Sequence, residues 1–195
     1  MIYLNDDIAH FSFEDALPLL SEQRKAQALR FRHEQGRKLC AMAYLLLCEG
    51  LRKEYGIDEL PEFGYGPYGK PFIVGHTDIH FNLSHCQEGA ICVLSDRPVG
   101  VDIESLDAYQ ANLVKHTMNF RERVRIRCAA RPDIEFVRLW TMKEAVLKCS
   151  GVGLIDDLKP VLNGPLELIT KDGPGNRYAY SVCYGSVQLQ PDMKP

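Results

Sequence analysis

Residues 140–148, with the sequence WTMKEAVLK, constrain the fold more than any other stretch of this chain. Apolar side chains in and just before this stretch recur at helical spacing, and Gly151 supplies a stop, so we expect a helix that ends at this glycine. At 3.6 residues per turn, Trp140, Glu144 and Lys148 fall on one side of that helix. One helix face then presents an aromatic ring, a carboxylate and an ammonium group to the same region.

Lys143 lies next to Glu144 around the same helix, which brings a second ammonium group close. Taken alone, the pattern also fits a surface helix with a Glu-to-Lys pair four residues apart, and such a pair stabilises a helix by only about 0.2–0.5 kcal/mol. A second stretch of the chain favours a functional interpretation.

That second stretch is VGVDIE, residues 99–104, in which apolar residues alternate with Asp102 and Glu104. On a strand, both carboxylates would project from the same face and repel each other. A strand edge with two solvated acids explains the pattern without any ligand. A hard divalent cation such as magnesium, which prefers oxygen ligands, explains it better once Glu144 of the downstream helix is added as a third carboxylate.

Four motifs resemble those of the 4'-phosphopantetheinyl transferase superfamily, in the same order along the chain. GVDIE at 100–104 and WTMKEAVLK at 140–148 resemble the two signature motifs of that family. YGKP at 68–71 and FNLSH at 81–85 resemble its upstream motifs. The resemblance extends from about residue 24 to residue 154, and it is closest to the longer, two-lobed, surfactin-synthetase-activating type.

The resemblance implies an α+β fold with two similar α/β lobes that form a pseudo-dimer. The N-terminal lobe, residues 1–98, would hold the nucleotide end of coenzyme A. The C-terminal lobe, residues 99–195, would carry the magnesium site and the helix described above. The turn at Asp96 would be the hinge between the lobes.

The activity implied by the resemblance is transfer of the 4'-phosphopantetheine arm from coenzyme A to a serine of an acyl or peptidyl carrier protein, with Mg²⁺ as cofactor. The implied metal ligands are Asp102, Glu104 and Glu144, and the residues expected to carry the reaction are Glu144, Lys148 and Asp102. The residues expected to bind coenzyme A are Arg37, Lys70, Ser84, His85, Lys143 and Lys148. The base that deprotonates the serine is either Glu144 or a metal-bound water.

Three further positions are weaker candidates. Arg24 lies near a basic position of the family, and Glu122 aligns loosely with an acid near the family's metal. Trp140 is expected to pack in the core. The arginine-rich residues 107–131 are either a solvated helix face or a basic surface for an acidic carrier protein.

Composition narrows the remaining possibilities. A formal net charge of −3 without a polybasic run does not indicate nucleic acid or an anionic membrane as partner. The longest apolar run, residues 39–48, is about half a membrane span. Acids near the N-terminus do not fit a secretory signal, and seven cysteines without a C-x-x-C pair are better explained as small core residues in a reducing cytoplasm. A fused two-lobed chain would act as a monomer.

Two other functions fit the same motifs. One is a coenzyme A-binding pseudoenzyme, against which the intact acids and lysines argue. The other is a magnesium-dependent hydrolase of a nucleotide pyrophosphate, which would use water in place of the carrier serine.

Local patterns predict the other elements. Helices are expected from Ser21 onward and over residues 39–55, with a joint at Gly36 between them. Strands are expected at 2–4, 79–83, 90–94, 166–170 and 178–189, with residues 84–89 as a connection and residues 190–195 as a loose tail.

Overall fold

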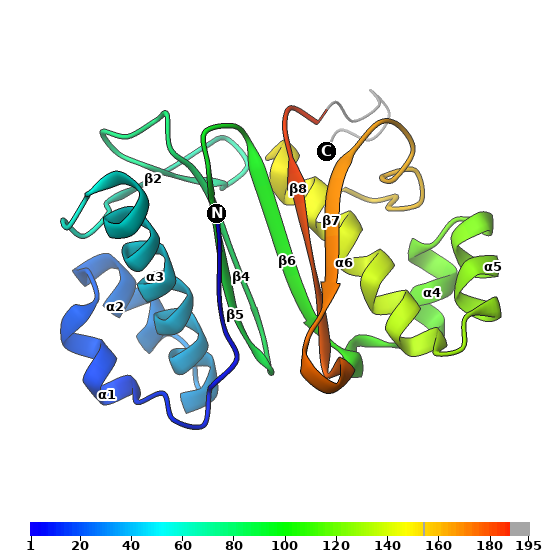
Figure 1. Cartoon of the computed structure of the whole chain (residues 1–195), viewed down its shortest axis with the longest axis horizontal. Coiled ribbons are helices and arrows are strands. Elements are labelled where there is room, and N and C mark those ends of the chain that lie inside the picture. The colour runs from blue at the N-terminus through cyan, green and yellow to red at the C-terminus, as the bar shows by residue number, and fades with distance from the viewer. Residues whose placement is uncertain (154, 188–195) are drawn as a thin grey trace.

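The computed structural model describes residues 1–153 and 155–187, and it has a mixed α/β fold (Figure 1). The helices and strands of these residues follow in this order: β1 (Ile2–Asn5), α1 (Phe13–Ala16), α2 (Glu22–Leu29), α3 (Glu34–Tyr55), β2 (Phe63–Tyr65), β3 (Pro71–Ile73), β4 (His80–Cys86), β5 (Gly89–Ser95), β6 (Val99–Ser105), α4 (Ala111–Thr117), α5 (Phe120–Cys128), α6 (Pro132–Ser150), β7 (Glu167–Asp172) and β8 (Tyr178–Tyr184).

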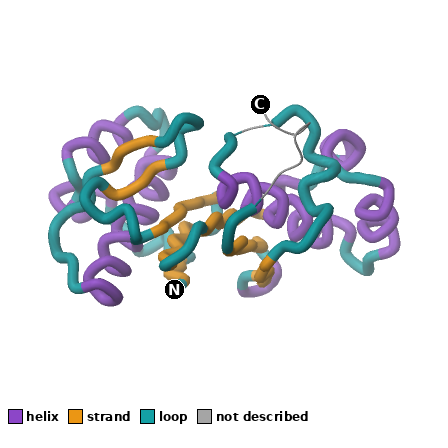
Figure 2. Tube along the Cα trace, turned by 90° about the horizontal axis from the view of Figure 1, so that it is seen from above, coloured by secondary structure: helices purple, strands orange, loops and turns teal. Residues whose placement is uncertain are grey.

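The strands form two three-stranded sheets and one small hairpin. The first sheet has the order β1-β5-β4, the second has the order β6-β8-β7, and β2 pairs with β3. All of these pairings are antiparallel. Seen from above, the strands of the two sheets occupy the middle of the molecule and the helices flank them on either side (Figure 2).

Strand β5 is buried on both faces, because its alternate residues pack into two different cores. Ala90, Cys92 and Leu94 lie in a hydrophobic cluster with residues of α3. Ile91 and Val93 lie in a second cluster with residues of β6 and β8. Since successive side chains of a strand point to opposite faces, β5 joins α3 on one side to the second sheet on the other.

The long helix α6 covers the second sheet and ends where the sequence predicts. Gly151 caps it in the left-handed conformation, with φ of 70°, and its backbone N–H donates to the carbonyl of Leu147. A glycine at this position avoids the steric cost that a side chain would meet at positive φ. The predicted helix, its stop and the strand that carries the two acids are therefore confirmed.

Three local predictions are wrong in whole or in part. Gly36 lies inside α3 and is not a joint. The ring of Phe31 packs against this glycine, and an atom of that ring would lie 2.7 Å from an ideal Cβ at position 36. Strand β4 runs on to Cys86, so Ser84 and His85 belong to the strand and not to a connection. The strand predicted at 178–189 ends at Tyr184 within the described part, and the expected tail at 190–195 lies outside the described residues.

The other expected elements near the N-terminus are confirmed: the first strand is β1, and Ser21 caps α2 by accepting a hydrogen bond from the backbone N–H of Arg24. The seven cysteines are free, and five of them are buried as expected; Cys128 is exposed and Cys48 is half-buried. Across the described residues, no helix is long and apolar enough to cross a membrane. The division into two similar lobes at residue 98 stays a prediction.

Gly100 lets α6 approach β6 closely, and this contact supports a first prediction. An ideal Cβ on Gly100 would lie 2.2 Å from the carbonyl oxygen of Ala145 and 2.3 Å from the backbone nitrogen of Cys149, and backbone atoms cannot give way cheaply. We therefore expect Gly100→Ala to lower the free energy of unfolding by about 1–3 kcal/mol. Thermal denaturation measures this, with Gly66→Ala as the control because an ideal Cβ on Gly66 meets only Lys70 O, at 3.6 Å. Equal melting temperatures for the two variants would contradict the prediction.

Candidate active site

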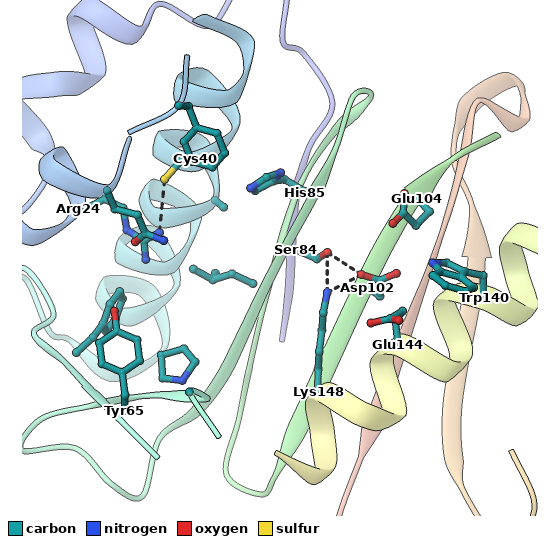
Figure 3. A pocket seen from close by; sticks show the side chains of 17 residues that line it. Arg24, Cys40, Tyr65, Ser84, His85, Asp102, Glu104, Trp140, Glu144 and Lys148 are labelled. Atoms are coloured by element: carbon teal, nitrogen blue, oxygen red, sulfur yellow. Dashed lines mark hydrogen bonds and ion pairs between the residues drawn. The ribbon is translucent and has the colours of Figure 1, made fainter. Parts of the chain in front are cut away.

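A cleft of about 620 Å³ lies between α2, α3 and the β2–β3 hairpin on one side and β6 and α6 on the other, with β4 between them (Figure 3). Polar residues of both sides line it: Arg24, Ser84, His85, Asp102, Glu104, Trp140, Glu144 and Lys148. The acids predicted from β6 and from α6 therefore face the same space. Their approach follows from the alternation along β6 and the four-residue spacing along α6.

The ammonium group of Lys148 binds two partners at the centre of this cleft. Its Nζ lies 2.5 Å from Oδ1 of Asp102 and 3.1 Å from Oγ of Ser84. The hydroxyl of Ser84 in turn donates to Oδ1 of Asp102 at 2.9 Å. These three residues come from α6, β6 and β4, and together they bring an ammonium group and a carboxylate to one point.

Glu104 and Glu144 lie beside this group and are both half-buried. Burial, the nearby charge of Asp102 and that of Glu144 raise the pKa of Glu104 to about 7, against a partial opposing effect of Lys148. Burial and Asp102 also raise the pKa of Glu144. The single ammonium of Lys148 therefore leaves the three carboxylates incompletely neutralised, and the site favours an additional positive charge.

The three acids fit a hard divalent cation in their chemistry. Oδ2 of Asp102 is buried and has no hydrogen-bond partner in the described part of the chain, and a carboxylate oxygen in this condition is costly unless a cation or donor meets it. Within residues 1–153 and 155–187, however, no three His, Cys, Asp or Glu side chains already form a group that could hold a metal ion. The acids supply suitable ligands without forming a complete cage.

Arg24 is the main cation at the opposite side of the cleft. Its side chain is buried, and its guanidinium carbon lies 5.0 Å from the ring centre of Tyr44 and 5.2 Å from that of Phe63. Nη1 approaches Sγ of Cys40 at 3.7 Å, and Nε is buried without a partner among the described residues. A buried guanidinium supported mainly by aromatic rings favours an anion in the cleft.

His85 lies on the same side of the cleft, where it is exposed and packs edge-on against Phe31. Desolvation at the cleft wall, together with the positive charges of Lys148 and Arg24, lowers the pKa of His85. The free imidazole is therefore mostly neutral near pH 7. An anion bound beside it would reverse this effect.

Two residues predicted to bind coenzyme A do not line this cleft. Arg37 donates its Nε to the backbone carbonyl of Phe31 at 2.9 Å and so holds the start of α3. The Nζ of Lys70 donates to the carbonyls of Val99 and Cys149, each at 3.0 Å, and burial lowers its pKa. These contacts join the hairpin to β6 and α6, and Lys70 borders smaller cavities beside the cleft.

Lys143 also lies away from the cleft. Its side chain is completely buried, with Nζ 2.9 Å from a carboxylate oxygen of Glu122 and 2.8 Å from the carbonyl of Leu158. Burial lowers the pKa of Lys143, and Glu122 opposes the shift. One position along a helix rotates a side chain by about 100°. For that reason Lys143 turns away from Asp102 although it directly precedes Glu144.

Two residues contribute more to the cleft than the sequence indicated. Trp140 packs on Phe136 beside a hydrophobic core cluster, as expected, with ring centres 6.0 Å apart, and it is half-buried and also lines the cleft. Arg24, a weak candidate in the sequence, is central. Its only local signal was its place in the first turn of a helix capped by Ser21.

Comparison with known proteins finds relatives of one kind. Residues 98–179 match the family model of the 4'-phosphopantetheinyl transferase superfamily. A 4'-phosphopantetheinyl transferase of Bacillus subtilis is 28% identical over 157 residues, which cover 78% of this chain and 70% of that protein. The 4'-phosphopantetheinyl transferase gsp of Aneurinibacillus migulanus is 35% identical over 94 residues, covering 47% of this chain and 39% of the relative.

A third relative comes from yeast: the L-aminoadipate-semialdehyde dehydrogenase-phosphopantetheinyl transferase of Saccharomyces cerevisiae is 28% identical over 189 residues, which cover 89% of this chain and 69% of that protein. The family-model match includes the segments that carry the acids and the helix α6. The fold and the cleft therefore define an enzyme of mixed α/β architecture with an acidic and a basic side to its site. Residues 98–179 therefore match the 4'-phosphopantetheinyl transferase superfamily, and the enzyme activity that the relatives support is that of a 4'-phosphopantetheinyl transferase.

The two lysines of α6 provide a test of these assignments. Lys143→Met leaves the buried carboxylate of Glu122 without its counter-charge, so we expect it to lower the free energy of unfolding by about 3–5 kcal/mol. Lys148→Met is the matched comparison, because the Lys148 side chain is 31% exposed and the buried carboxylate of Asp102 keeps the hydroxyl of Ser84 as a donor. We expect a much smaller loss for this variant. Urea denaturation of both variants makes the comparison, and a larger loss for Lys148→Met would show that the assignments are reversed.

Proposed function

We propose that this enzyme transfers the 4'-phosphopantetheine arm from coenzyme A to a serine of an acyl or peptidyl carrier protein, with Mg²⁺ as cofactor. The observation that carries the proposal is the arrangement of one cleft with a cluster of carboxylates and an ammonium at one side and a buried guanidinium at the other. Coenzyme A has phosphate groups at two separate places, a pyrophosphate and a 3'-phosphate, and such a cleft suits both.

Arg24 and His85 would bind the 3'-phosphate of the nucleotide. Arg24 already lies in the cleft without a carboxylate partner in the described part of the chain, and His85 faces the same side. Guanidinium and imidazole groups are good donors to phosphate oxygens. Arg37, Lys70 and Lys143 have other partners, so they would support the fold around the nucleotide and not bind it directly.

Asp102, Glu104 and Glu144 would hold the magnesium ion. When bound, the ion would neutralise charge on the pyrophosphate and act as a Lewis acid. Lys148 lies beside these acids through its contact with Asp102, and it would neutralise a phosphate oxygen as the leaving group gains negative charge. The reaction needs mainly positioning and charge neutralisation, and the chain's own groups supply both.

The carrier serine must lose a proton as it attacks phosphorus. Either Glu144, which lies in the cleft beside Asp102 and Lys148, or a water bound to the metal ion would accept this proton. The partner would be an acidic carrier protein. Exposed arginines of α5 and the exposed ring of Phe120 would offer it a basic and partly apolar surface.

Three further parts of the proposal concern the whole molecule. The enzyme would act as a monomer in the cytoplasm. Residues 1–98 and 99–195 would form two lobes of similar fold, each with a three-stranded sheet and one long helix. The cleft would lie where the two lobes meet.

The proposal can be tested by mass spectrometry of apo-carrier proteins incubated with the enzyme, coenzyme A and Mg²⁺. Addition of the phosphopantetheine mass to the carrier supports it. Cleavage of coenzyme A in the absence of a carrier would favour the nucleotide pyrophosphate hydrolase instead. Binding of coenzyme A without either reaction would favour the coenzyme A-binding pseudoenzyme.

Glu144→Gln provides a sharper test of the site. Glutamine keeps the size of the side chain but neither accepts a proton nor binds a cation well, so we expect transfer to fall at least about a hundredfold while the melting temperature is retained. Asp133→Asn, at the other end of the same helix, is the control and should transfer normally. Near-normal labelling of the carrier by Glu144→Gln would exclude the proposed role.

The pKa of His85 predicts proton uptake when nucleotide binds. The free imidazole is mostly neutral because its pKa is lowered, whereas a bound phosphate dianion raises that pKa, so binding near pH 7 should take up a fraction of a proton. Calorimetric titration with adenosine 3',5'-bisphosphate, in EDTA and in two buffers of different ionisation enthalpy, measures the uptake. His85→Gln should bind more weakly and lose that uptake. Equal uptake by the variant would place the phosphate elsewhere.

A further inference from the structure

The seam between strands β4 and β6 crosses the floor of the cleft without backbone pairing. Among the strands of the described residues, β4 pairs with β5 and β6 pairs with β8, and no ladder joins β4 to β6. The two strands nevertheless lie close enough for direct side-chain contacts. Backbone groups along this edge of β6 therefore need partners other than a neighbouring strand.

Asn82 of β4 supplies one such partner. Its side-chain oxygen accepts a hydrogen bond from the backbone N–H of Val101 at 2.8 Å, and both residues are buried. A buried N–H without an acceptor costs about 1–3 kcal/mol, so this contact replaces the missing ladder bond. It acts on the residue that directly precedes Asp102.

Asn82 and Ser84 lie two residues apart on β4, and they contact two successive residues of β6. Asn82 binds the backbone of Val101, and Ser84 binds the carboxylate of Asp102. The first contact fixes the peptide from which the carboxylate projects, and the second fixes the carboxylate itself. The position of Asp102 relative to Lys148 thus depends on both.

We propose that Asn82 is a positioning residue for the transfer reaction: its side-chain oxygen holds the Val101 amide and thereby sets the direction of the Asp102 carboxylate across the seam. This inference rests on the proposed roles of Asp102 and Lys148. A displacement of the carboxylate by about 1 Å is enough to cost a reaction of this kind roughly a hundredfold. The inference concerns the rate of the step and not the affinity for the nucleotide.

A competing explanation is direct contact between Asn82 and substrate, because Asn82 also borders a smaller cavity of about 270 Å³ beside the cleft. The two explanations use different atoms of the amide. Positioning needs the oxygen, whereas donation to substrate needs the nitrogen. Asn82→Asp keeps an acceptor and loses the donor, and Asn82→Leu loses both.

The experiment measures transfer kinetics and the hydrogen exchange of the Val101 amide in the full chain. For Asn82→Leu we expect faster exchange at Val101 and a kcat about ten- to a hundredfold lower, with KM for coenzyme A within about twofold. For Asn82→Asp we expect slow exchange and a kcat near that of the wild type. Any loss in that variant should appear in KM, because the added charge repels the phosphates.

Thr117→Val is the control variant, since it removes one hydroxyl bond to the carbonyl of Leu113 within α4, neither residue lines the cleft, and it should change neither kcat nor the exchange at Val101. Equal loss of kcat in Asn82→Asp and Asn82→Leu would overturn the proposal in favour of direct contact. Normal kcat in a folded Asn82→Leu would overturn it as well. Amide exchange is measured without substrate, so it tests the contact between Asn82 and Val101 independently of the transfer activity. Failure of the wild-type enzyme to label a carrier would reject the proposed function and leave the exchange result standing.

Discussion

The contact between Lys148 and Asp102, shared with Ser84, connects the three elements on which the cleft depends. It joins α6 to β6 and β4, and it places an ammonium group among three carboxylates. Burial raises the pKa of Glu104 and Glu144, and the negative charge of Asp102 adds to both shifts. A site with unsatisfied negative charge suits a cation and, through it, an anionic substrate.

This polar arrangement relies on an apolar one directly beneath it. Ile91 and Val93 of β5 pack with Val101 and Ile103 of β6, and all four side chains are fully buried. The burial of these side chains stabilises the packing of the two sheets. Along the same seam, Asn82 binds the Val101 amide and Ser84 binds the Asp102 carboxylate. Strands β4 and β6 therefore lack backbone pairing with each other and still hold Ser84 and Asp102 in contact.

The environment divides the two lysines of α6 into different roles. Lys143 is surrounded by protein and neutralises Glu122, so it holds α5 against α6. Lys148 is partly exposed and meets Asp102 in the cleft. At the other side, Arg24 has aromatic rings beside it in place of a carboxylate and stays available to an anion. The partner of each charged side chain, more than its residue type, decides whether it is paired inside the protein or available at the cleft.

The sequence by itself determined α6, β6 and the acids they carry, because helical and strand periodicities are local and place Asp102, Glu104 and Glu144 on defined faces. Its motifs also pointed to the correct family. Only the tertiary structure decided that Arg24 enters the cleft and that Lys143 does not. Which long side chain finds a partner depends on segments distant in sequence, such as the loop at Leu158 that binds Lys143, and no local pattern records such contacts.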